Sequence, residues 1–135
     1  MTELEIFAKT LFGEARGEKL PGIEAVANVI LNRVKHAKKI GSFWWGKTIE
    51  EVCLKPFQFS CWNKNDPNRP LMTQDLKENK IYQMCERVAK RAAAGFLPDN
   101  TNGATHYHTL KCNPVWAKCA VPCAEIGHHL FYAIY

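Results

Sequence analysis

The stretch LFGEARGEKLPGIEAVANVILNRV, residues 11–34, decides the fold, because two apolar helical patterns meet in it across a short polar turn. Upstream of the turn, apolar residues recur at helical spacing as Leu4, Phe7, Ala8, Leu11 and Ala15. Gly17 and Pro21 are expected to end this first helix. Residues 22–37 form a second helix that is apolar on most of its circumference, which predicts that it lies in the centre of the core.

The rest of the chain predicts two further helices and a short β element. TIEEVC (48–53) and TQDLKENKIYQMCERVAKRAAAG (73–95) each begin with threonine, a favoured N-cap residue, and the second ends at a glycine. ATHYHTL (104–110) and HHLFYAIY (128–135) are rich in β-branched and aromatic residues, which indicates strands but not their pairing. We predict one domain over residues 1–135, of the α+β class, mostly α, with the β element near the C-terminus.

Composition and charge are those of a folded globular domain. A chain of 135 residues buries roughly two-thirds of its unfolded surface. No run reaches the roughly 18 apolar residues of a membrane span, and the first ten residues are acidic where a signal peptide is basic. Lysine and arginine (18) exceed aspartate and glutamate (13), a net charge of +5. This excess favours a polyanionic partner: nucleic acid, a membrane surface or an anionic cell-wall polymer.

Six cysteines exceed what a cytosolic domain of this size usually carries, so they suggest an oxidising destination or a metal. The spacing of Cys112, Cys119 and Cys123 ahead of His128 and His129 contains no CxxC pair. We therefore predict no metal site and no cofactor.

Glu14 interrupts the apolar face of the first helix. It lies about 20 degrees from Phe7 and about 60 degrees from Leu11 around the helix axis, so its carboxylate is expected to be partly desolvated. Desolvation raises a glutamate pKa above its ordinary value of about 4.3, which suits a general acid near neutral pH. The alternative is a boundary glutamate that reaches solvent or an arginine such as Arg16 or Arg33.

Several separated motifs together resemble one known family. In chain order they are GEARGE (13–18), GIEAVANVILNRV (22–34), FSCW (59–62), GATHYH (103–108), P-x-W (114–116) and IGHHLFY (126–132). Their order resembles the SleB-like cell wall hydrolase family, which includes spore cortex-lytic enzymes and phage or prophage relatives. The resemblance implies a small lysozyme-like domain that cuts peptidoglycan glycan strands between N-acetylmuramic acid and N-acetylglucosamine. It also implies that Glu14, the first glutamate of GEARGE, is the catalytic residue.

A single catalytic glutamate suits a lytic transglycosylase. A conventional glycosidase needs two carboxylates, about 5 Å apart for retention or about 6.5 to 9.5 Å apart for inversion. Asp66 offers a second carboxylate but nothing in the sequence marks it, and Glu18 is expected to be a solvated carboxylate at the helix end. A transglycosylase needs one group that first donates a proton to the glycosidic oxygen and then deprotonates the sugar's own 6-hydroxyl. Hydrolysis remains the alternative outcome.

Substrate contacts are expected from aromatic and polar residues of the other motifs, because sugar faces pack on aromatic rings and N-acetyl groups need hydrogen bonds. The candidates are Phe59, Ser60, Trp62, Asn63, His106, Tyr107 and His108. Strand alternation places His106 and His108 on one face and Tyr107 on the other. Core packing is the alternative for Trp62 and Trp116, and a hydrogen-bonded structural role is the alternative for the two histidines.

The roles expected of four other polar residues are structural. We assign His128 and His129 to structure, and we expect Asn28 and Asn32 to satisfy backbone groups near the cleft.

The expected partner is a peptidoglycan glycan strand, bound by a monomer that acts at the cell envelope. Because no signal peptide is seen, we predict synthesis in the cytoplasm and release by another route, as for a phage or prophage lysin, or removal of a leader. One alternative is a basic nucleic-acid-binding module that uses the VAKRAAAG helix, although no recognised motif organises its basic residues. Another is a non-catalytic glycan-binding or phage structural protein.

An envelope destination also motivates the prediction of at least one disulfide. Cys53 and Cys61 are the expected pair, because they bracket a short loop that carries the FSCW motif. Six free thiols are the alternative, since synthesis in a reducing cytoplasm needs no bridge.

Overall fold

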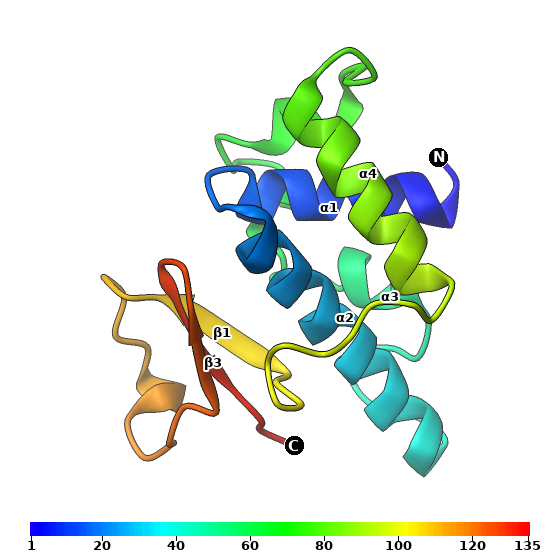
Figure 1. Cartoon of the computed structure of the whole chain (residues 1–135). Helices are drawn as coiled ribbons and strands as arrows, with labels where there is room; N and C mark the ends of the chain where they lie inside the picture. Colours follow the sequence, from blue (N-terminus) through cyan, green and yellow to red (C-terminus); the bar gives the residue numbers. More distant parts are fainter.

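The computed structural model describes all 135 residues and places a helical body beside a small sheet (Figure 1). The helices are α1 (Glu3–Ala15), α2 (Leu20–Ile40), α3 (Ile49–Leu54) and α4 (Lys80–Ala93). The strands are β1 (His106–Thr109), β2 (Ala124–Ile126) and β3 (His129–Tyr132), and short 3₁₀ turns lie at Ser60–Trp62, Arg69–Thr73 and Val115–Ala117. The predicted α+β class, mostly α with a C-terminal β element, is confirmed. None of the helices is long and apolar enough to cross a membrane.

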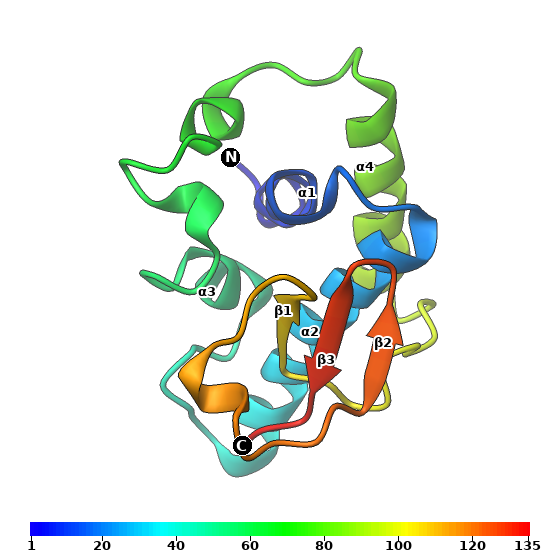
Figure 2. The same ribbon diagram turned by 90° about the vertical axis from the view of Figure 1, so that its left-hand side faces the viewer.

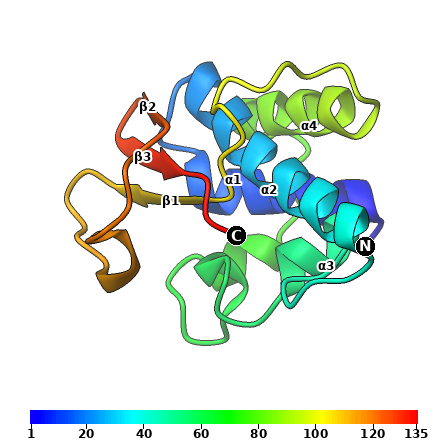
Figure 3. The same cartoon turned by 90° about the horizontal axis from the view of Figure 1, so that it is seen from below.

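The second helix runs between the sheet and the other helices (Figure 3) and separates two apolar clusters. Val26 and Ile30 belong to a core of 24 buried residues shared with the other helices. Val29, which lies between them in the sequence, packs instead with Ala104 and Phe131 beneath the sheet. The prediction that this helix lies in the centre of the core is confirmed. The helix is apolar on most of its circumference because it packs against the other helices on one side and the sheet on the other.

Two predicted helix boundaries are wrong. Pro21 does not close the first helix but occupies the first turn of α2, where its missing N–H costs no hydrogen bond. Helix α4 begins at Lys80 rather than at Thr73. The reason is that the Asn79 side chain accepts a hydrogen bond from the backbone N–H of Tyr82 and so caps the helix there.

The three strands form an antiparallel sheet in the order β1-β3-β2, with β3 in the middle (Figure 2). Tyr107 of β1 pairs with Phe131 of β3, and Thr109 pairs with His129. Gly127 turns the chain tightly between β2 and β3 with a φ of 58°, a left-handed conformation that favours glycine. The sequence left the pairing of the strands open. In the structure β2 and β3 form a hairpin, and β1 pairs with the other edge of β3.

All six cysteines are free thiols. The Cys53 thiol lies beside the Thr10 hydroxyl, whereas Cys61 packs beside Gly13. The predicted disulfide between Cys53 and Cys61 is therefore wrong: both thiols are free and are packed against successive turns of α1.

Candidate active site

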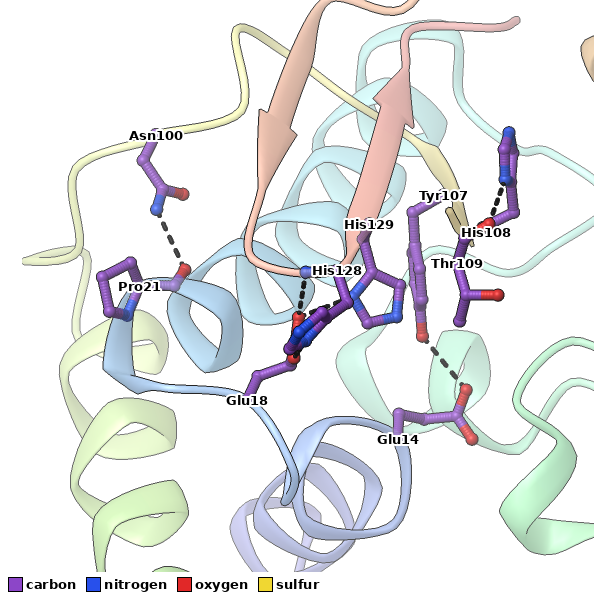
Figure 4. Close-up of polar contacts among 9 residues, drawn as sticks. All are labelled: Glu14, Glu18, Pro21, Asn100, Tyr107, His108, Thr109, His128 and His129. Atoms are coloured by element: carbon purple, nitrogen blue, oxygen red, sulfur yellow. Dashed lines mark hydrogen bonds and ion pairs between the residues drawn. The ribbon is translucent and has the colours of Figure 1, made fainter. Parts of the chain in front are cut away.

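Glu14 lies in the last turn of α1, and its half-buried carboxylate faces β1 (Figure 4). Its Oε1 atom accepts a hydrogen bond of 3.0 Å from the Tyr107 hydroxyl. Its Oε2 atom accepts one of 3.4 Å from the backbone N–H of Cys61. A helix end, a 3₁₀ turn and a strand that are far apart in the sequence therefore meet at this carboxylate.

Gly13 allows the turn that contains Cys61 to approach α1 closely. A Cβ atom at position 13 would lie 2.7 Å from the Cys61 Cβ atom and 2.8 Å from its sulfur atom. Contacts this short do not occur between real side chains, so any larger residue would push the turn away. The absence of a side chain next to Glu14 thus lets the Cys61 N–H reach the carboxylate.

The Glu14 carboxylate has two hydrogen-bond donors but no basic partner. Burial raises the pKa of Glu14, while the weaker effects of the Tyr107 and Cys61 hydrogen bonds lower it. Arg16 donates to Asn68 instead, and Arg33 donates to the Thr105 carbonyl oxygen. Neither arginine named in the boundary-glutamate alternative therefore pairs with Glu14.

Tyr107 is held as a hydrogen-bond donor. Its ring lies between two others, with ring centroids 5.2 Å from His129 and 5.6 Å from Phe131. Burial, reinforced by the nearby Glu14 carboxylate, raises the pKa of Tyr107 well above 10. The phenol therefore stays neutral and keeps its proton, which it donates to Glu14.

The two strand histidines lie on the opposite face of β1 from Tyr107, as alternation predicts. Their rings lie 5.3 Å and 5.6 Å from the half-exposed ring of Trp116, for His106 and His108 respectively. Burial, together with the charge of Arg33, lowers the pKa of His106 to about 4, so this ring is neutral at pH 7. His108 hydrogen-bonds the Tyr132 hydroxyl through Nε2 at 2.8 Å. Neither histidine contacts Glu14 in the structure.

The FSCW motif divides between core and surface. Phe59 is only 2% exposed and packs against the Arg33 guanidinium, so its ring belongs to the core, and its role in binding substrate stays a prediction. The backbone turn reverses direction here, which exposes Ser60 and leaves Trp62 partly exposed. The Trp62 indole is fixed by a 2.9 Å hydrogen bond from Nε1 to the Thr10 hydroxyl.

A groove runs past Trp62 and Asn63 along the molecular surface. It has a volume of about 760 Å³ and is lined by residues 54–57, 62–67 and Arg69. A second hollow of about 500 Å³, lined by 43–46 and 50–51, shares part of the same wall. The groove includes Trp62, which follows the Cys61 N–H donor in the chain, but Glu14 is not among the residues that line it. Asp66 in the groove wall is near enough to raise the Glu14 pKa further.

Sequence analysis missed two exposed aromatic residues of these hollows. Trp44 is 51% exposed and Phe57 is 84% exposed. The available signal was the FWW run at 43–45 and a phenylalanine inside a polar loop, because neighbouring exposed rings often mark a binding surface.

The prediction that Glu18 is a solvated carboxylate is wrong. Its side chain is 6% exposed and accepts hydrogen bonds of 2.9 Å from the backbone N–H of His128, 2.7 Å from the His128 ring and 2.9 Å from the His129 ring. Burial opposes the ionisation of Glu18, but these hydrogen bonds outweigh it and lower the pKa to about 2. Figure 4 shows both histidines directed at this carboxylate.

The two asparagines of α2 fulfil their predicted role. Asn28 donates to the Pro98 carbonyl oxygen at 3.0 Å, and Asn32 donates to the Ala104 carbonyl oxygen at 2.9 Å. They tie the loop that leads into β1 to the central helix and so help to place Tyr107.

Residues 17–132 match the family model of the cell wall hydrolases, a range that begins just after Glu14. The spore cortex-lytic enzyme of Halalkalibacterium halodurans is 28% identical over 134 residues, which are 96% of this chain and 34% of that protein. The spore cortex-lytic enzyme of Bacillus cereus is 27% identical over 134 residues, which are 96% of this chain and 43% of that protein. The chain therefore spans less than half the length of these relatives.

Two solved structures have the same fold. The catalytic domain of the germination-specific lytic transglycosylase SleB from Bacillus anthracis matches with a TM-score of 0.69 and 25% identity, over 96% of this chain and 93% of that chain. The catalytic domain of the Bacillus cereus SleB protein matches with the same TM-score and identity, over 96% of this chain and 88% of that chain. The resemblance inferred from the order of the motifs is confirmed: the chain belongs to the SleB-like cell wall hydrolase family.

Proposed function

We propose that this protein degrades peptidoglycan by cleaving the linkage between N-acetylmuramic acid and N-acetylglucosamine, as a lytic transglycosylase. The observation that carries the proposal is the Glu14 carboxylate, which is half-buried, has a raised pKa, lacks any basic partner and lies near Asp66 in the wall of a groove. Burial that raises the pKa favours the protonated form of Glu14, which is the form a general acid needs.

The reaction uses Glu14 twice. Protonated Glu14 donates its proton to the leaving glycosidic oxygen while the bond from that oxygen to the anomeric carbon of the muramic acid breaks. The Glu14 carboxylate then removes the proton of the muramic 6-hydroxyl as this oxygen attacks the anomeric carbon. The product is a 1,6-anhydro sugar, no water is consumed, and Glu14 ends protonated as it began. The Tyr107 hydroxyl stabilises the intermediate carboxylate, because it donates to Oε1.

Substrate contacts are proposed for the polar and aromatic groups that reach the surface. Trp62 offers a fixed ring for a sugar face, and Asn63 and Ser60 offer hydrogen bonds to N-acetyl groups. On the other face of β1, His106 and His108 frame the exposed ring of Trp116, a second surface on which the glycan strand can pack. A monomer that belongs to a phage or prophage lysis system stays our prediction for the biological setting, and neighbouring holin or tail genes would support it.

Digestion of purified peptidoglycan by the wild-type protein tests the proposal. A zone of clearing in a zymogram separates an enzyme from a nucleic-acid-binding module and from a non-catalytic glycan-binding protein. Mass spectrometry of the released muropeptides then separates the two reactions. Products lighter by one water than hydrolysis products support transglycosylation, whereas products with a free reducing end would assign hydrolysis, which needs a second carboxylate.

A further inference from the structure

The Glu18 carboxylate connects the turn after α1 to the hairpin formed by β2 and β3. Both of its oxygen atoms are used, with Oε1 accepting from the His128 backbone N–H and the His129 ring, and Oε2 accepting from the His128 ring. An ionised carboxylate only accepts hydrogen bonds, so both rings present a protonated Nδ1 atom to it. The Glu18 side chain is 6% exposed and the His129 side chain 8% exposed, so their contact is covered, whereas the His128 ring lies at the surface.

Two glycines make room for this carboxylate. A Cβ atom at position 22 would lie 2.7 Å from the Glu18 Cβ atom. A Cβ atom at position 127 would lie 2.5 Å from Glu18 Oε1 and would also be strained by the left-handed backbone there. Helix α2 and the β2–β3 hairpin therefore each have a glycine where they contact the Glu18 side chain.

The contact continues from the hairpin to Glu14. The His129 ring meets the Tyr107 ring edge-on, with centroids 5.2 Å apart and planes at 80°. The Tyr107 hydroxyl in turn donates to Glu14 at 3.0 Å. Figure 4 shows His129 between Glu18 and Tyr107, with the Tyr107 hydroxyl directed at Glu14.

The rest of the sheet is weakly fixed near this point. The apolar cluster between the sheet and α2 contains only four buried residues, compared with 24 in the main core. Arg33 holds the chain at Thr105, just before β1, through a 2.7 Å hydrogen bond to its carbonyl oxygen. Glu18 holds the opposite end, because its partner His129 pairs with Thr109 at the end of β1.

We propose that Glu18 is a positioning residue for the reaction: it holds the hairpin through His128 and His129, and so fixes Tyr107 against Glu14. Glu14 and Glu18 lie four residues apart at the end of α1 and in the turn after it. The contact through Glu18 therefore holds β1, which carries Tyr107, to the same stretch of backbone that carries Glu14. This proposal rests on the proposed function, in which Glu14 is the acid and base.

The first test compares three carboxylate substitutions in digestion assays. Glu18→Ala should lower kcat by up to roughly 100-fold while KM changes little, because a misplacement of about 1 Å has that effect on a catalytic geometry. Glu18→Gln should keep most of the activity, since its amide oxygen can accept both Oε1 bonds and its NH₂ group can donate to the other tautomer of His128. Glu24→Gln is the matched control, because Glu24 pairs with Arg91 on the outside of α2, and its kcat should stay unchanged.

The second test asks whether Glu18 acts through Tyr107. Tyr107→Phe removes the donor that lowers the Glu14 pKa, so the alkaline limb of kcat/KM should move to higher pH. Glu18→Ala should move the same limb in the same direction. In a Tyr107→Phe background, Glu18→Ala should cause little further loss of kcat, because residues that act through one contact are not additive.

Circular dichroism melts check that each variant is folded at the assay temperature. Should Glu18→Ala not fold, Glu18→Asp replaces it, since it keeps the charge but withdraws it from the histidines by one methylene, and kcat should still fall with the same pH shift. Near-native kcat in a folded Glu18→Ala or Glu18→Asp protein, or equal losses with and without the Tyr107 hydroxyl, would overturn this inference. Glu14→Gln is assayed in parallel. If it is inactive, a failure concerns Glu18 alone, and if it is active, the proposed function fails and this inference with it.

Discussion

Position 13 shows how much one residue controls in this site, because a side chain there would occupy the space of Cys61. Gly13→Ala should destabilise the protein by about 1–3 kcal/mol, since an inserted methyl group in a packed interior forces its neighbours apart. It should also lower activity, because the Cys61 N–H moves away from Glu14. Urea unfolding and digestion rates measure the two effects.

Gly17 provides the matched control for that substitution. A Cβ atom at position 17 meets no atom within 4 Å, and the backbone there has no left-handed φ. Gly17→Ala should therefore be neutral or stabilising by about 0.4–1 kcal/mol, through the lower entropy of the unfolded chain. Equal stabilities of the two variants would contradict the packing described for Gly13.

Glu14 itself gives the most direct test at the scale of a residue. Glu14→Gln keeps the shape of the side chain but cannot donate a carboxylic proton, so turnover should fall by at least the roughly 10²- to 10⁴-fold of general acid catalysis. Glu18→Gln and Asp66→Asn should lose less. Because burial raises the Glu14 pKa, the ionised form costs stability at pH 7, and its neutral isostere should unfold at equal or slightly higher urea concentration. Near-native turnover would make Glu14 a boundary glutamate after all.

At the scale of an element, the beginning of α4 can be tested directly. The structure places the N-cap at Asn79, whose side chain accepts from Tyr82 N at 3.0 Å. Asn79→Ala should cost about 0.5–2 kcal/mol of stability, as loss of an N-cap usually does. Thr73→Ala should cost little, because the Thr73 hydroxyl contacts only the Pro70 carbonyl oxygen at 3.3 Å. Thermal unfolding of both variants measures the two losses of stability. A larger loss in Thr73→Ala than in Asn79→Ala would contradict the N-cap at Asn79.

At the scale of the whole molecule, the connection between sheet and helices should depend on pH. The folded-state pKa of Glu18 is about 2, below the ordinary value of 4.5. A depressed carboxylate pKa adds stability above the unfolded value, and this contribution is lost as the pH falls from about 4.5 towards about 2. Wild type should therefore be more stable than Glu18→Gln at pH 7, and the difference should shrink across that interval. Urea unfolding from pH 7 to pH 2.5 measures it, and a constant difference would contradict the assignment.

Local signals in the sequence were enough to predict much of the fold. The two central helices, the α3 cap at Thr48 and two of the three strands, β1 and β3, were predicted because helical periodicity, capping and strand propensity depend on residues close in the chain. The short strand β2 was not predicted. Alternation along β1 also separated Tyr107 correctly from His106 and His108. The order of the motifs identified the family, and Glu14 was placed on the flank of an apolar face where the structure has it half-buried.

Only the tertiary structure decided which of these residues meet. Glu18 was expected in solvent because its partners lie 110 and 111 residues further along the chain, and no local pattern encodes such a contact. Phe59 and Cys61 are buried while Ser60 between them is exposed, because the 3₁₀ turn packs on α1, and spacing alone did not show that the Phe59 ring is buried. The sequence by itself determined the helices, the family and the candidate acid, because these follow from short-range patterns. The tertiary structure determined the burial of Glu14, its donors and the connection through Glu18, because these depend on surfaces that exist only once the chain has folded.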